Sequence, residues 1–295
     1  MFWSSTTSRD MNDLSGKVAI VTGSNTGLGY AILKGLARGG AKVYMAARNE
    51  TKATSAIAAL EADGIKPGSV VWLKLELSDL DGVVKAAEEF MSKETRLDIL
   101  INNAAVHFGH FVLVQTLLPL LIKTTKALEA DVRIINVSSD AHHHVPEVQF
   151  QTINDFKLEW KSGMSAGIAR YGHTKLANVL FTNELQRRFD EKDVPILVIA
   201  LHPGLVFTFA ELLPLRVITE PIARLLVTSP DKASRTPLFA AASPIPREKL
   251  ETYKANYLTP TCQFGKKSKQ GADPELGKDL WELTEKVLKE NFFSE

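Results

Sequence analysis

Tyr171 and Lys175 are spaced four residues apart and could together manage a proton. The segment Tyr171–Arg188 has amphipathic helical spacing, and residues at i and i+4 share one face of a helix. A tyrosine with a reference pKa of about 10 is a poor acid or base at pH 7, and bringing it near neutrality takes about 3 units, or roughly 4 kcal/mol. Because a nearby positive charge favours the phenolate, we expect Lys175 to lower the pKa of Tyr171. The same spacing also arises in ordinary surface contacts.

A glycine turn near the start of the chain could hold a phosphate. It reads Thr22-Gly23-Ser24-Asn25-Thr26-Gly27-Leu28-Gly29 and lies between a predicted strand (17–22) and a predicted helix (28–38). Glycine allows positive φ and a close backbone approach, and the helix N-terminus offers free N–H groups to an anion. The spacing is a variant of the dinucleotide-binding fingerprint. We predict a bound nicotinamide dinucleotide; the alternative is a tight turn without a ligand.

The residues after the second predicted strand indicate which dinucleotide. An NAD site usually has an acidic residue there for the ribose 2′-hydroxyl. This chain has Ala46-Ala47-Arg48-Asn49, with no carboxylate to repel a 2′-phosphate and with Arg48 able to bind one. The sequence therefore favours NADP(H) and leaves NAD(H) possible. The alternative for Arg48 is a solvated residue at the start of a helix.

Five motifs occur in an order that is similar to one enzyme family. They are Thr22 to Gly29, Asn102-Asn103-Ala104-Ala105, Asn136-Val137-Ser138-Ser139, Tyr171-Gly172-His173-Thr174-Lys175 and His202-Pro203-Gly204. Together they resemble the short-chain dehydrogenases/reductases, over roughly residues 13–290. The stretch Tyr171–Leu185 resembles the retinol-dehydrogenase-like branch, and Asp13–Val18 and Asp279–Leu283 are similar to filamentous-fungal members.

This resemblance implies a role for each matching residue. Tyr171 is the general acid/base, Lys175 lowers its pKa and holds the nicotinamide ribose, and Ser139 polarises the substrate oxygen, with Ser138 as its structural neighbour. Glu76 stands where the family usually has an aspartate that contacts adenine. The cofactor-binding residues implied are Gly23, Asn25, Thr26, Gly27, Leu28, Gly29, Arg48, Glu76, Leu77, Asn102, Ala104, Tyr171, Lys175, Pro203, Gly204, Val206 and Thr208.

The chain departs from the family pattern after Val106, which runs directly into His107. About 20 residues of the usual pattern are absent, and with them the asparagine that completes the family's catalytic tetrad. That asparagine normally holds a water in the proton path behind the lysine. Three readings follow: a weakened enzyme, a splice or gene-model product that scarcely turns over, or a relay in which another group such as His107 takes the role.

The elements that must position these residues alternate between strand and helix. Predicted strands are 17–22, 42–46, 70–75, 97–101, 132–137 and 196–201; predicted helices are 28–38, 51–62, 79–93, 108–128, 171–188 and 277–291. This alternation predicts an α/β, doubly wound parallel sheet of the Rossmann type in a three-layer αβα arrangement. We expect a single domain over 1–295, with an N-terminal extension (1–12). Residues 140–165 and 203–275 look irregular, and 203–275 is predicted to form a substrate lid.

Composition sets limits on function. The 295 residues carry a net charge of +1 without a basic block, which gives no support to nucleic-acid binding. No signal peptide and no spanning apolar run are evident, so we predict a cytoplasmic location and leave peripheral membrane association open. His142-His143-His144 has no partner ligand at a usual metal spacing, so no metal is expected. A homo-oligomer is possible.

These observations lead to two functional hypotheses. The first is an NADP(H)-dependent oxidoreductase that moves hydride between nicotinamide and a secondary alcohol or carbonyl. The apolar segment 207–227 hints at a lipophilic small-molecule substrate. The alternative is a catalytically impaired or inactive dinucleotide-binding protein, because the tetrad asparagine is absent.

Overall fold

The computed structural model describes residues 11–66, 68–156, 164–204 and 228–292. Its centre is an eight-stranded sheet in the order β3-β2-β1-β4-β5-β6-β7-β8. The strands are β1 (Val18–Thr22), β2 (Lys42–Ala47), β3 (Val70–Lys74), β4 (Ile99–Asn102), β5 (Arg133–Val137), β6 (Leu197–Leu201), β7 (Tyr257–Thr259) and β8 (Gln263–Phe264). All neighbouring pairs are parallel except β7 with β8. The predicted doubly wound parallel sheet is confirmed.

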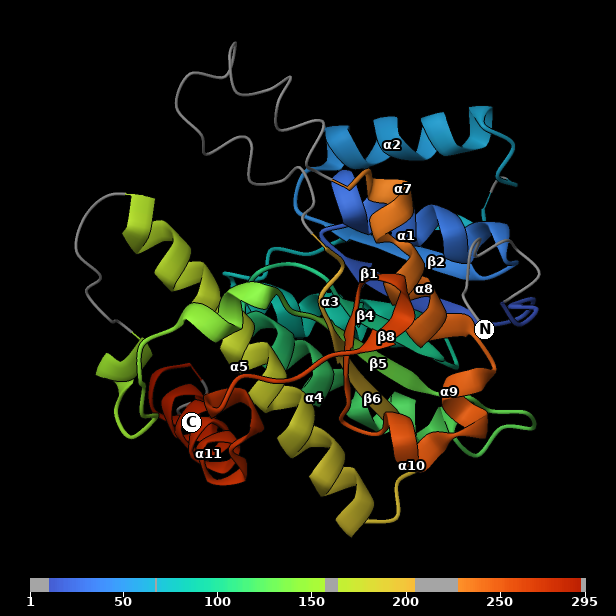
Figure 1. Ribbon diagram of the computed structural model, residues 1–295. Coiled ribbons are helices and arrows are strands. Elements are labelled where there is room, and N and C mark those ends of the chain that lie inside the picture. Colours follow the sequence, from blue (N-terminus) through green and yellow to red (C-terminus); the bar gives the residue numbers. More distant parts are fainter. Residues whose placement is uncertain (1–10, 67, 157–163, 205–227, 293–295) are drawn as a thin grey trace.

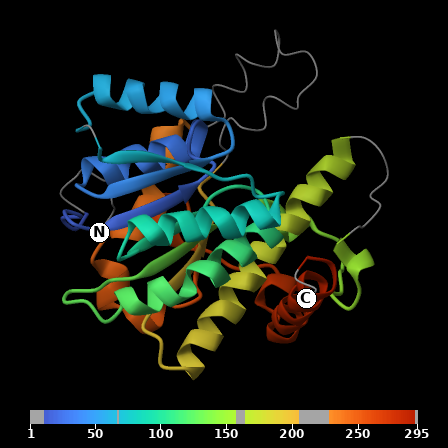
Figure 2. The same ribbon diagram turned by 180° about the vertical axis from the view of Figure 1, so that it is seen from behind.

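Helices cover both faces of the sheet, because successive residues of each strand point to opposite faces. Ala19 and Val21 of β1 contact one core, and Val18 and Ile20 contact the other. The first face carries α1 (Gly27–Arg38), α2 (Glu50–Ala62) and α8 (Arg235–Ala242); the second carries α3 (Leu80–Lys93), α4 (Phe108–Thr124) and α5 (Met164–Glu191) (Figures 1 and 2). Helix α11 (Pro274–Asn291) packs on α5. These layers form the predicted three-layer αβα arrangement.

Short helical turns lie between these elements. They are η2 (Asp140–His144), η3 (Ile153–Phe156), α7 (Pro230–Ala233), α9 (Ile245–Glu248), α10 (Leu250–Tyr253), η5 (Pro260–Cys262) and η6 (Gln270–Ala272). The prediction that 203–275 is irregular is therefore wrong for 230–264. Its prolines begin helices there: Pro230 occupies the first turn of α7 and Ser229 caps it. Among the described residues, no helix is long and apolar enough to cross a membrane.

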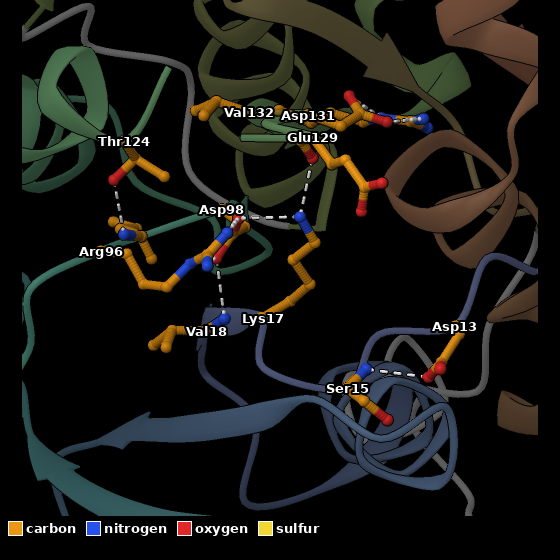
Figure 3. Close-up of polar contacts among 12 residues, drawn as sticks. Asp13, Ser15, Lys17, Val18, Arg96, Asp98, Thr124, Glu129, Asp131 and Val132 are labelled. Carbon is orange, nitrogen blue, oxygen red and sulfur yellow. Dashed lines mark hydrogen bonds and ion pairs between the residues drawn. The ribbon is translucent and has the colours of Figure 1, made fainter. Parts of the chain in front are cut away.

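A polar network fixes the ends of the strands opposite the glycine turn (Figure 3). The buried Asp98 carboxylate accepts a hydrogen bond from the Val18 N–H at 2.9 Å and from Arg96 Nε and Nη2 at 2.8 and 2.6 Å. Lys17 Nζ lies 3.7 Å from the same carboxylate and donates to the Glu129 carbonyl at 2.9 Å. Bidentate pairing with arginine offsets the cost of burying Asp98. The network therefore holds β1 beside β4. It thereby fixes the relative position of the carboxyl ends of these two strands, where the glycine turn begins.

Candidate active site

The glycine turn lies where neighbouring strands lead to opposite sides of the sheet. β1 pairs with both β2 and β4, and such a switch point is where doubly wound sheets bind ligands. Gly23 and Gly27 have φ of +63° and +58°, so both need the left-handed conformation that glycine adopts at low cost. At Gly29 a Cβ would lie 2.5 Å from the Gly23 carbonyl oxygen. All three glycines are thus required by the backbone itself.

The start of α1 fits an anion. Side chains cap α2, α3 and α11, through Asn49, Asp79 and Asp273, whereas neither Thr26 on α1 nor His107 on α4 makes a side-chain cap bond. The first N–H groups of α1 therefore remain available as donors beside the helix's positive dipole end. A Cβ built on Gly27 would meet no atom within 4 Å, so open space lies next to these donors. This cradle fits the phosphates of a dinucleotide.

Thr22 joins the glycine turn to the loop after β4. Its Oγ1 accepts the backbone N–H groups of Asn103 at 3.0 Å and Ala104 at 3.2 Å. The Asn103 side chain donates back to the Thr22 carbonyl at 2.9 Å. Neither Thr22 nor Asn103 was assigned a role from the sequence, although both belong to the five motifs. Asn102, by contrast, is fully buried and donates to Asn136 at 2.8 Å, so its side chain braces β4 against β5.

The proposed catalytic side chains meet beyond the end of β5. The Tyr171 hydroxyl is hydrogen-bonded to the Ser139 side chain. Lys175 Nζ lies 5.5 Å from the centroid of the Tyr171 ring. Ser138 Oγ donates to the Lys175 carbonyl at 2.7 Å, so Ser138 holds α5 rather than facing the reaction. Since β1 and β5 are parallel, the catalytic side chains and the glycine turn both lie at the carboxyl ends of the strands.

Burial dominates the electrostatics of this pair. It raises the pKa of Tyr171 above its ordinary value, against an opposing effect of the Ser139 hydrogen bond. It lowers the pKa of Lys175 to about 7, because the amine is removed from water. We expected Lys175 to lower the pKa of Tyr171. That expectation is wrong for the protein without a bound cofactor, because burial raises this pKa instead.

Arg48 and Glu76, predicted as separate cofactor contacts, form an ion pair. Arg48 Nη1 lies 3.6 Å from Glu76 Oε2, and the Arg48 side chain is 78% exposed. The Ser78 hydroxyl donates to Glu76 at 2.8 Å, and this bond is the main cause of a lowered Glu76 pKa. Exposed ion pairs contribute little, about 0–1 kcal/mol. Arg48 is thus free to exchange Glu76 for another anion at low cost.

The other predicted cofactor residues divide between the described and undescribed parts of the chain. Asn25 and Leu28 belong to the glycine turn, and Pro203 and Gly204 follow β6, where Gly204 has a φ of +98°. Leu77 precedes α3 and contacts Gly109 of α4. Val206 and Thr208 lie outside the described residues, as does the whole of the 207–227 segment.

Histidines near the site have structural partners. His107 Nε2 pairs with Thr284 Oγ1 of α11 at 2.9 Å, which gives no support to a relay through His107. His110 Nε2 instead pairs with Thr22 Oγ1 at 2.9 Å. His142 Nε2 accepts the Ser268 N–H at 3.0 Å, so its Nδ1–H donates to the Ser139 carbonyl at 2.7 Å. In the described ranges, no group of three or more potential metal ligands occurs.

Known proteins are similar to this chain in sequence and fold. The short chain dehydrogenase family model matches residues 17–108 and ends at the junction where the chain departs from the pattern. A short-chain dehydrogenase/reductase of Armillaria gallica is 39% identical, with 94% of each chain covered. That comparison spans 302 positions, whereas 94% of this chain is about 277 residues, so about 25 positions face gaps here.

Two further likenesses extend the comparison. Mouse retinol dehydrogenase 11 is 34% identical, with 92% of this chain and 86% of the relative covered. A crystal structure of a protein from Mycobacterium paratuberculosis is 28% identical with a TM-score of 0.72, and 98% of each chain is covered. The chain therefore belongs to the short-chain dehydrogenase/reductase family, oxidoreductases that use a nicotinamide dinucleotide and act on alcohol or carbonyl groups.

Proposed function

We propose that the protein is an NADP(H)-preferring oxidoreductase that interconverts a lipophilic secondary alcohol and its carbonyl. One observation carries this proposal. The Tyr171 hydroxyl is hydrogen-bonded to Ser139 beside the Lys175 ammonium, at the same sheet edge as the uncapped start of α1. A protein that only binds a dinucleotide does not need all three of these side chains.

The three side chains manage the proton and the substrate oxygen. When bound, NADP(H) gives or accepts the hydride at C4 of its nicotinamide. In carbonyl reduction, Ser139 donates a hydrogen bond to the carbonyl oxygen and Tyr171 transfers its proton to that oxygen. A raised pKa keeps Tyr171 protonated and ready for this step. Protonated Lys175 stabilises the phenolate that remains, and in alcohol oxidation that phenolate takes the proton back.

The other proposed cofactor contacts carry over the roles that the family resemblance implies. The uncapped N–H groups of α1 and the glycine turn bind the pyrophosphate, and Arg48 binds the 2′-phosphate. Glu76 and Leu77 lie beside the adenine, and Asn102 and Ala104 supply backbone next to the nicotinamide ribose. Pro203, Gly204, Val206 and Thr208 border the nicotinamide. The lid role of 203–275 stays a prediction.

The preference for NADP(H) rests on Arg48. A phosphate binds an arginine bidentately and more strongly than the exposed Glu76 contact does. We expect Arg48→Asp to weaken NADPH binding about tenfold or more and to leave NADH binding within about threefold. Lys66→Asp makes the same charge change at an exposed site and serves as the control. Unchanged NADPH affinity in Arg48→Asp would remove Arg48 from this role.

The lipophilic substrate class is supported by the relative that is named a retinol dehydrogenase, since retinol is a lipophilic alcohol. The decisive experiment is a screen of ketones and alcohols with NADPH and NADH in parallel, beside Tyr171→Phe. Turnover that is lost in Tyr171→Phe supports the proposal.

The second candidate is a dinucleotide-binding protein with impaired catalysis. The gaps that this chain shows against the Armillaria gallica relative agree with an absent segment. The family resemblance implies that this segment would carry the tetrad asparagine. NADPH binding without turnover of any compound in the screen would decide for this candidate.

A further inference from the structure

His110 connects the beginning of α4 to the end of β1. It lies in the first turn of α4, which starts at Phe108, and its Nε2 lies 2.9 Å from Thr22 Oγ1. By the alternation along β1, Thr22 points to the same face of the sheet as Val18 and Ile20, the face that α4 covers. Both side chains of the contact are buried. A buried polar link thus joins a covering helix to the first residue of the glycine turn.

The direction of this hydrogen bond follows from the other partners of the Thr22 hydroxyl. A hydroxyl has one proton to donate and two lone pairs that accept. The backbone N–H groups of Asn103 and Ala104 already donate to Oγ1, at 3.0 and 3.2 Å. The Thr22 proton can go to His110 Nε2 at 2.9 Å or to the Ile101 carbonyl at 3.5 Å, and only the first contact is of usual hydrogen-bond length. His110 Nε2 is therefore the acceptor, and the ring proton is on Nδ1.

His110 can accept this proton because its ring is neutral. Burial, followed by the charge of Lys175, lowers the pKa of His110 to about 3, against an opposing effect of the Val106 backbone. A protonated imidazole would donate from both nitrogens and would have no lone pair for Thr22. At pH 7 the ring is therefore a fixed acceptor for the Thr22 hydroxyl.

The loop that Thr22 holds packs directly on the glycine turn. A Cβ built on Gly23 would lie 3.4 Å from Ala104 Cβ, and one built on Gly29 would lie 2.8 Å from Asn103 Nδ2. The Asn103 side chain also donates to the Thr22 carbonyl at 2.9 Å. Because the loop and the turn are in contact, a shift of one moves the other. The position of residues 103–104 therefore affects the phosphate cradle as well.

We propose that His110 is a positioning residue for the dinucleotide. By accepting the Thr22 proton, it directs both Thr22 lone pairs to the backbone of Asn103 and Ala104, and so fixes the 103–104 loop against the cradle. His110 acts only through Thr22 and has no part in the hydride or proton transfer. The inference rests on the proposed function, in which Ala104 borders the nicotinamide ribose and the turn binds the pyrophosphate.

Fluorescence titration of the full chain with NADPH tests this role. His110→Phe keeps an aromatic ring but leaves the Thr22 proton without its acceptor, and it should weaken NADPH binding about tenfold. His110→Gln supplies a carbonyl acceptor and should keep the affinity within about threefold of the native chain. His107→Phe is the matched control, because His107 is also buried and neutral but pairs with Thr284 of α11. This control should lower stability and leave NADPH affinity unchanged.

A double-mutant cycle shows whether His110 acts through Thr22. Thr22→Val removes the hydroxyl but keeps a side chain of similar shape, and it should weaken NADPH binding about tenfold or more. In that background His110→Phe should cause no further loss, because the hydroxyl that His110 orients is gone. Losses that multiply in the double variant would contradict a role through Thr22.

Hydrogen exchange without cofactor gives an independent readout. The amide protons of Asn103 and Ala104 should exchange about tenfold faster in His110→Phe than in the native chain, and at the native rate in His107→Phe. Unchanged exchange at these amides in His110→Phe, or native NADPH affinity in that variant, would overturn this inference alone. Absence of NADPH binding by the native chain would overturn the proposed function and this role together.

Discussion

Lys175 Nζ donates a hydrogen bond of 2.8 Å to the carbonyl oxygen of Val137, the last residue of β5. The Asn178 side chain donates to the same carbonyl at 3.1 Å. The lysine is thereby held under Tyr171 with its amine almost fully buried and its pKa lowered to about 7. The fold thus places a costly group at the centre of the proposed site.

Replacing this lysine should stabilise the fold. The unfolded chain binds more protons than the folded chain between pH 7 and 10.5, so the contribution of Lys175 to stability rises with pH across that window. Lys175→Met should therefore raise the free energy of unfolding at pH 7 by on the order of 2–4 kcal/mol, with the gain shrinking towards pH 10. Urea unfolding at pH 7 and 9.5 measures this, with exposed Lys278→Met as the control. A less stable Lys175→Met at pH 7 would contradict the pKa shift.

A matched pair of glycine substitutions distinguishes an effect on cofactor binding from an effect on folding stability. Gly27 and Gly64 both have positive φ and open space around an added Cβ. Gly27→Ala and Gly64→Ala should each lower the free energy of unfolding by about 1–2 kcal/mol. Only Gly27→Ala should also weaken dinucleotide binding, by about tenfold, because its methyl group enters the space beside the α1 donors. Equal dinucleotide affinity of the two variants, measured by fluorescence titration, would show that the cradle lies elsewhere.

Buried histidines should make the protein sensitive to acid. Burial lowers the pKa of His107 and His110 to about 3 and that of His142 to about 4. The unfolded chain therefore binds more protons below pH 6.5, and stability is lost as the pH falls from 6.5 towards these values. Each buried neutral histidine can lower the free energy of unfolding by up to about 1.4 kcal/mol for every pH unit in that range.

Urea unfolding at pH 7, 5.5 and 4.5 measures this loss. His142→Gln should flatten the dependence, whereas His144→Gln at an exposed site should not. A free energy of unfolding that stays constant down to pH 4.5 would show that these rings are charged or accessible in the fold.

The absent segment can be restored. Inserting the family-like stretch with its asparagine between Val106 and His107 should raise NADPH-dependent carbonyl reduction on the order of tenfold or more, because it completes the proton path. The same insert with alanine in place of the asparagine is the control. Equal turnover of the native chain and the insertion variant would end the hypothesis of a damaged site.

Most of the fold could be predicted from local patterns. The β-branched run at 17–22 and the apolar spacing of 28–38 became β1 and α1, because buried parallel strands and amphipathic helices leave strong periodic signals. The pattern at 108–128 was also helical, and Pro119 did not end α4, which ends at Thr124. The short strands β7 and β8 were missed because two or three residues carry no period, and their place is set by pairing with β6 and with each other.

The candidate site likewise has features that local sequence patterns predict and features that depend on tertiary contacts. The sequence by itself predicted the glycine turn and the Tyr171–Lys175 pair, because a phosphate cradle and a proton donor need particular residue types at fixed local spacing. Ser139 was predicted from the family resemblance alone. Only the tertiary structure decided that Thr22 ties the turn to Asn103. It also decided that burial governs the pKa values of Tyr171 and Lys175. These properties depend on contacts between residues far apart in the chain, and local spacing carries no information about them.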